Sequence, residues 1–81
     1  MHYVYILQSE KDQKFYIGQT DNVERRLSEH NRGKQRSTKN RVPLKIAYIE
    51  TFQTRIQAMK REKYLKSLKG GNTFKKIIAG E

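Results

Sequence analysis

The fold of this chain is decided near its start, where residues 2–18 read HYVYILQSEKDQKFYIG. The two ends of this stretch, residues 2–8 and 14–18, are rich in aromatic and branched apolar residues, which favour strands. The polar residues between them have the composition of a turn. The pattern predicts a β-hairpin, which would bring the phenol groups of Tyr5 and Tyr16 into one neighbourhood.

Length and composition are those of a small single-domain protein. The chain, residues 1–81, is expected to form one domain, and it contains no cysteine. Disulfides, a thiolate nucleophile and a thiolate zinc site are therefore excluded. No apolar run approaches the roughly 20 residues of a membrane span, and the N-terminus lacks the regions of a signal peptide. We expect a cytoplasmic protein with no membrane partner.

The net charge is strongly positive, because 18 Lys and Arg stand against 8 Asp and Glu and give +10. Such a field attracts polyanions with an affinity that falls as salt rises, so nucleic acid is the expected partner. An anionic membrane surface would also suit the charge, but it requires an amphipathic helix with a bulky apolar face, and the helices expected here carry few apolar residues. A soluble basic domain without a polyanionic partner is the plain alternative.

The positive charge is concentrated after residue 30. Five of the acids come before that point, and only Glu50 and Glu62 lie between residues 31 and 80. Residues 31–43 contain no acid and almost nothing apolar, which predicts an exposed loop that is disordered without a ligand. The cations of this loop expected to contact nucleic acid are Arg32, Lys34, Arg36, Lys39 and Arg41.

A helix is predicted after the hairpin. Asp21 and Glu24 have the spacing of a capping box, and Val23 and Leu27 have the spacing of one helix face. Gly33 provides a stop at the C-terminal end.

The rest of the chain predicts one more strand and two more helices. Residues 44–52 have the composition of a strand, and Thr54 with Gln57 forms a capping box that opens a helix ending near Leu68. Residues 72–79 are predicted as a last short helix. The resulting order is β-β-α-β-α-α, and the fold class is α+β.

Two charged or titratable residues of the first helix are predicted to face inward. At 100° per residue, Arg26 and His30 fall on the side of Val23, whereas Arg25 points away. A buried guanidinium needs a partner, so Arg26 is either aimed into a cleft to bind a phosphate or packed along its stem with its head in solvent. A neutral, hydrogen-bonded histidine is the plain interpretation of His30.

Glu62 is a lone acid in a basic segment, flanked by Lys60, Arg61 and Lys63. A solvated carboxylate paired with neighbouring lysines is the usual explanation. Its partial alignment with the apolar face of the helix favours a second explanation, a carboxylate ligand for a hard cation such as Mg²⁺.

Four stretches follow one another along the chain: Tyr3-Val4-Tyr5, Tyr16-Ile17-Gly18, residues 21–31 (DNVERRLSEHN) and Lys60-Arg61-Glu62-Lys63. This ordered set resembles the GIY-YIG nuclease family, and more narrowly its small stand-alone bacterial members. The resemblance covers residues 2 to about 78. The first motif departs from the family name at Tyr3 and Val4, but the tyrosine that carries function in the family corresponds to Tyr5.

The resemblance implies a three-stranded antiparallel sheet flanked by helices and an endonuclease that nicks one DNA strand per site, in DNA repair or recombination. It implies one divalent ion, Mg²⁺ or Mn²⁺, as cofactor. Gly18 would let the backbone approach the substrate, and Lys63 would contact nucleic acid. The implied site consists of Tyr5 and Tyr16 as the site tyrosines, Arg26 as the phosphate ligand, His30 as an auxiliary base or hydrogen-bond partner, and Glu62 as the metal ligand.

Several questions stay open at this level. A tyrosine, with an ordinary pKa of about 10, is a poor base unless positive charge favours its phenolate, and either tyrosine could take that role. The main alternative to a nuclease is a nucleic-acid-binding module without turnover. A further alternative is a small protein that docks on an acidic surface of a partner. The sequence leaves open the substrate structure, DNA against RNA, the oligomeric state, and whether a protein partner supplies specificity.

Overall fold

A computed structural model of the chain describes residues 1–68 and 70–80. The element order is β-β-α-β-α-α, as predicted. The elements are β1 (His2–Ser9), β2 (Phe15–Thr20), α1 (Val23–Asn31), β3 (Leu44–Phe52), α2 (Arg55–Ser67) and α3 (Asn72–Ile78). None of these helices is long and apolar enough to span a membrane.

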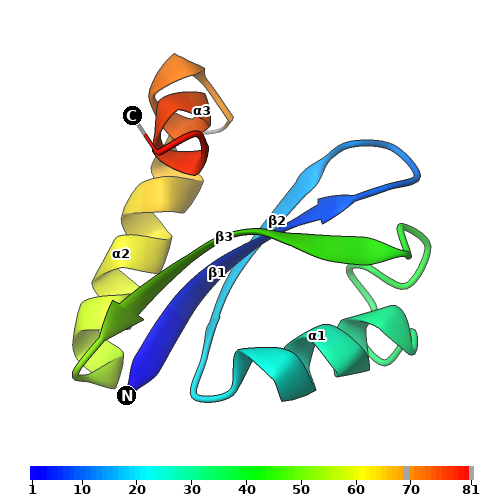
Figure 1. Cartoon of the computed structure of the whole chain (residues 1–81), viewed down its shortest axis with the longest axis horizontal. Helices are drawn as coiled ribbons and strands as arrows, with labels where there is room; N and C mark the ends of the chain where they lie inside the picture. The colour runs from blue at the N-terminus through cyan, green and yellow to red at the C-terminus, as the bar shows by residue number, and fades with distance from the viewer. Residues whose placement is uncertain (69, 81) are drawn as a thin grey trace.

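The three strands form one antiparallel sheet in the order β2-β1-β3, so β1 is central and β2 is an edge strand. Because side chains alternate along a strand, β1 supplies both faces with core residues. Val4 and Ile6 pack against α2 and α3, whereas Tyr5 and Leu7 pack on the side of α1. Figure 1 shows the sheet between α1 and the pair formed by α2 and α3.

The predicted cap of α1 is wrong by one residue. Asn22, not Asp21, is the N-cap, and its side chain accepts a hydrogen bond from the Arg25 backbone N–H at 3.0 Å. The reason is the preceding turn, in which the Thr20 hydroxyl accepts from the Asn22 backbone N–H at 3.1 Å and delays the helix start. Asp21 instead forms an ion pair with the Arg25 guanidinium.

The other helix signals are confirmed. Gly33 follows α1 with a φ of 76°, a conformation that favours glycine. The Thr54 and Gln57 side chains form the predicted capping box of α2, which ends at Ser67. Phe74 of α3 is buried in the core beneath the sheet.

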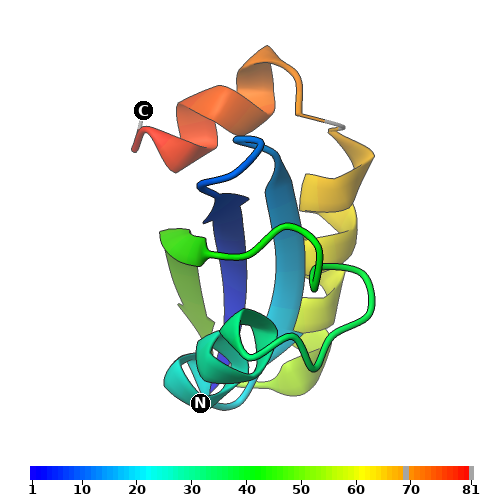
Figure 2. The same ribbon diagram turned by 90° about the vertical axis from the view of Figure 1, so that its right-hand side faces the viewer.

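The basic loop between α1 and β3 is tied down, contrary to the prediction of a disordered segment. The Asn31 side chain donates to the Leu44 carbonyl at 3.0 Å and accepts from the Leu44 backbone N–H at 2.7 Å. The Ser9 hydroxyl donates to the Arg41 carbonyl at 2.6 Å and so fixes the far end of the loop to the hairpin. In Figure 2 the loop passes in front of β2. Composition did not reveal these anchors, because each is a single uncharged polar side chain.

Candidate active site

Two tyrosines from neighbouring strands form the floor of the site. Tyr5 lies in β1, Tyr16 lies in β2, and their ring centroids are 6.3 Å apart. The register places Gly18 opposite Tyr5. A Cβ atom on Gly18 would lie 2.6 Å from the Tyr5 Cζ, so the absence of a side chain makes room for the phenol. Gly18 is therefore buried beneath Tyr5, and the predicted close approach of its backbone to substrate does not fit this arrangement.

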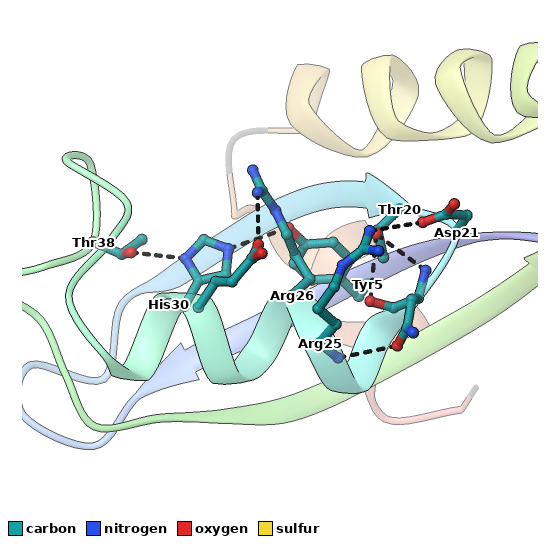
Figure 3. A network of polar contacts seen from close by, with 9 residues as sticks. Tyr5, Thr20, Asp21, Arg25, Arg26, His30 and Thr38 are labelled. Atoms are coloured by element: carbon teal, nitrogen blue, oxygen red, sulfur yellow. Dashed lines mark hydrogen bonds and ion pairs between the residues drawn. The ribbon is translucent and has the colours of Figure 1, made fainter.

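His30 joins the two tyrosines from the last turn of α1. Its ring is fully buried, and its centroid lies 4.8 Å from that of Tyr16. The Nε2 atom lies 3.2 Å from the Tyr5 hydroxyl, and the Nδ1 atom lies 2.8 Å from the Thr38 hydroxyl. Figure 3 shows the resulting chain of contacts from Thr38 through His30 to Tyr5. It links the loop, α1 and the central strand.

Burial sets the protonation states of His30 and Tyr5. Burial lowers the pKa of His30 below 6.5, and the nearby Arg26 charge lowers it further. Burial raises the pKa of the Tyr5 phenol above 10.0, an effect that the adjacent Arg26 guanidinium partly opposes. At neutral pH His30 is therefore a neutral imidazole with one unprotonated nitrogen, and Tyr5 is a phenol.

Arg26 lies one helical turn before His30, and its side chain is 31% exposed. Its Nη1 atom lies 3.1 Å from the Glu29 carboxylate. With the Gln35 amide turned so that its oxygen faces the guanidinium, that oxygen accepts from both terminal nitrogens at 2.8 and 3.1 Å. The head group is thus neither free in solvent nor deeply buried, but held at the rim of the site beside Tyr5.

Glu62 approaches the same site from α2. Its side chain is 20% exposed and forms an ion pair with Lys66 at 3.1 Å. Burial is the main cause of the raised pKa of Tyr5, and the negative charge of Glu62 adds a small contribution in the same direction. Because β2 is an edge strand, α1 on one face and α2 on the other can both present side chains at this edge.

The residues around Glu62 suit only one kind of metal site. In residues 1–68 and 70–80 there is no cluster of three or more His, Asp or Glu side chains that could enclose an ion. A single carboxylate fits Mg²⁺ or Mn²⁺ when water and substrate oxygens complete the coordination. Glu62 can provide that one ligand if Lys66 gives up its ion pair.

Most of the residues predicted to contact nucleic acid are exposed, but Arg41 is partly buried and bound to other residues of the protein. Its Nε lies 3.4 Å from the Asp12 carboxylate, and its Nη2 donates to the Phe15 carbonyl at 3.3 Å. Arg41 thus fastens the loop to the hairpin, because a turn carboxylate and an edge-strand carbonyl lie within its reach. The exposed members of the predicted set are Arg32, Lys34, Arg36, Lys39 and Lys63.

Two polar residues of the site were missed in the sequence. Thr38 is fully buried against His30 although it lies in a basic loop, and Gln35 contacts Arg26. Neither residue has a charge, a spacing or a motif that distinguishes it, since contacts made by an irregular loop follow no period. Their roles become visible only when the loop is seen folded over α1.

The sequence of the chain is similar to one protein family and to several relatives. The family model described as the GIY-YIG catalytic domain matches residues 1–75. A UPF0213 protein of Bacillus licheniformis is 44% identical over 72 residues, which are 88% of this chain and 73% of that protein. A UPF0213 protein of Staphylococcus haemolyticus is 42% identical, over 94% of this chain and 93% of its own length.

The fold also matches a solved structure. The NMR structure of a UPF0213 protein of Bacillus halodurans is similar with a TM-score of 0.57 and 32% sequence identity. The match covers 98% of this chain and 82% of that one. The names of these relatives give a family and no reaction, so the chemistry has to be inferred from the site.

Proposed function

The chain belongs to the GIY-YIG catalytic-domain family, a nuclease superfamily, and from that premise we propose that it is a metal-dependent endonuclease that nicks one strand of DNA per site. The observation that carries the proposal is the contact chain of Thr38, His30 and Tyr5, buried beside an arginine. Breaks introduced in one strand suit DNA repair or recombination, which we propose as the setting.

The chain of contacts can move a proton. When the Nδ1–H group of His30 donates a hydrogen bond to the Thr38 hydroxyl, the unprotonated Nε2 accepts a hydrogen bond from the Tyr5 hydroxyl. Tyr5 can then take a proton from an attacking water while it passes its own proton to His30. The phenolate never has to accumulate, so the raised pKa of Tyr5 is no obstacle. Tyr16 packs against the imidazole and holds its orientation.

The charged residues have separate tasks in this scheme. Arg26, at the rim and beside Tyr5, binds the scissile phosphate by exchanging its contact with Gln35 for phosphate oxygens. Glu62 would hold Mg²⁺ or Mn²⁺, which when bound supplies positive charge to stabilise the departing oxygen. Both tasks place positive charge where the transition state gains negative charge.

A nicking assay on a panel of duplex, branched and single-stranded DNA and of RNA, with Mg²⁺ or Mn²⁺, tests the proposal. We expect Glu62→Ala to abolish nicking and largely to spare DNA binding, and Arg26→Ala to weaken both. Glu10→Ala, at an exposed turn, is the matched control and should nick like the unaltered chain. Retained nicking by Glu62→Ala would contradict the assigned metal ligand.

A nucleic-acid-binding module without turnover is the second candidate. The observation in its favour is that both charged groups of the site already have partners, Glu29 and Gln35 on Arg26 and Lys66 on Glu62. Binding without cleavage of any member of the panel, with either metal, would favour this candidate.

A further inference from the structure

A groove of about 550 Å³ opens beside the first half of β2 and has no role in the proposed cleavage reaction. Its volume lies in the range of about 300 to 1,000 Å³ that is typical of ligand sites. Phe15 and Ile17 give it an apolar lining, and the Phe15 ring lies edge to face on the buried Phe74 ring, with centroids 5.4 Å apart. The exposed lysines Lys14 and Lys66 also line it, and the described residues of the lining include no acid.

The groove borders the candidate active site at the β2 edge of the sheet. Tyr16 lines the groove and also contacts His30. Lys66 lines it too and forms the ion pair with Glu62. A molecule that lies in the groove is therefore a neighbour of the phosphate expected between Arg26 and Glu62.

A partly exposed aromatic ring with lysines beside it suits one kind of ligand in a basic protein. Sequence-tolerant binding of single-stranded nucleic acid combines aromatic contacts to the bases with cations along the backbone. We propose that this groove binds an unpaired nucleobase next to the scissile phosphate, an inference that rests on the proposed function. Lys14 and Lys66 would then bind the flanking phosphates.

This occupancy defines the substrate class. A base inside a duplex is stacked and paired, and it reaches such a groove only if it is flipped out at the cost of both interactions. The protein should therefore act on strands with an unpaired nucleotide at the cut, as in a single strand, a flap or a gap, in preference to a continuous duplex.

Binding measured without divalent metal tests the groove separately from catalysis. The probe is a DNA hexanucleotide with one 2-aminopurine, compared with a hairpin in which the same base is paired. We expect the single strand to show a change in 2-aminopurine fluorescence on binding and the hairpin to show little. Phe15→Leu, which keeps an apolar side chain, should reduce the change, with folding checked by circular dichroism.

The lysines are tested by affinity. Lys14→Ala and Lys66→Ala should each weaken binding of the hexanucleotide about fivefold near 0.15 M salt and reduce the salt slope by about 0.7, the effect of one lost phosphate contact. Lys45→Ala, exposed on the opposite edge strand, is the matched control and should change neither quantity.

The outcomes separate this inference from the proposed function. The inference would be overturned if the single strand and the hairpin gave equal changes in fluorescence, or if the three groove variants had no effect. The groove would then have another occupant, such as a peptide or a second copy of the chain. Nicking that persists in that case would leave the endonuclease proposal standing. A groove signal without any nicking would support the base site and contradict the endonuclease.

Discussion

At the scale of single residues, the protonation of His30 controls the proposed chemistry. Burial lowers its pKa below 6.5, so the imidazole is already neutral at pH 6.5 and becomes protonated only at lower pH. The raised pKa of Tyr5 keeps the phenol protonated throughout the neutral range. The pair is therefore competent over the whole neutral range, and its limit lies on the acidic side.

We predict that nicking is independent of pH from about 7 to 9 and falls as the pH drops below 6.5, because protonated His30 cannot accept the Tyr5 proton. The measurement is kcat/KM against pH with saturating metal. His30→Gln should lower the rate and remove the dependence on this group. A rate that rises on acidification through this range would contradict a neutral imidazole as acceptor.

A second prediction concerns Gly18. A Cβ atom at this position would meet the Tyr5 ring, with the Cζ atom only 2.6 Å away. Gly18→Ala should therefore displace the phenol from His30 and reduce nicking by about tenfold or more, since each 1.36 kcal/mol of barrier is a factor of ten. Overpacking should also lower the unfolding free energy by about 1 to 3 kcal/mol.

Urea unfolding and the nicking assay, run on the same preparation, separate the two effects of Gly18→Ala. Gly71→Ala, at an exposed position before α3, serves as the matched control because its Cβ would meet only the Leu68 carbonyl, at 3.4 Å. Full activity in Gly18→Ala would show that the position of the Tyr5 phenol does not matter for nicking.

At the scale of elements, regular structure followed from the sequence and irregular structure did not. Aromatic and branched apolar composition predicted the strands, and the box of Thr54 and Gln57 predicted the start of α2, because both signals are local. The start of α1 was misplaced because Thr20, outside the helix, holds Asn22 in the capping position. The contact of Thr38 with His30 spans a loop with no period, so only the folded chain reveals it.

The loop between α1 and β3 therefore acts as part of the site, and its anchor can be tested. Asn31→Ala removes both hydrogen bonds to Leu44, which should cost about 1 to 2 kcal/mol of unfolding free energy and speed amide exchange in residues 34–41. Nicking should fall as well, because Thr38 is carried by this loop.

Two variants sharpen this test. Asn31→Asp keeps the acceptor for the Leu44 N–H and loses the donor, so its exchange rates should lie between those of the parent and Asn31→Ala. Asn40→Ala, in the same loop, alters a side chain with no hydrogen bond in the described structure and should resemble the parent. Unchanged exchange in Asn31→Ala would mean that other contacts hold the loop.

At the scale of the whole molecule, charge acts on folding and on binding in opposite directions. The chain has 18 Lys and Arg against 8 Asp and Glu, so ten cations remain even if every acid is paired. Their mutual repulsion opposes the compact state and attracts polyanions. Ion pairs at the surface, such as that of Arg25 with Asp21, contribute about 0 to 1 kcal/mol each and cannot offset an excess of this size.

We therefore predict that raising the salt from about 0.02 M to about 0.5 M stabilises the folded chain while it weakens nucleic-acid binding. The midpoint of thermal unfolding should rise by about 4 to 8 °C for each 1 kcal/mol of repulsion that is relieved. Lys34→Gln with Lys39→Gln, two exposed loop positions, should reduce both salt effects, because each removes a cation from the same field. A midpoint that falls with salt would mean that ion pairs, and not net repulsion, dominate the electrostatics of this fold, and the basic loop would then have to be explained by local contacts alone.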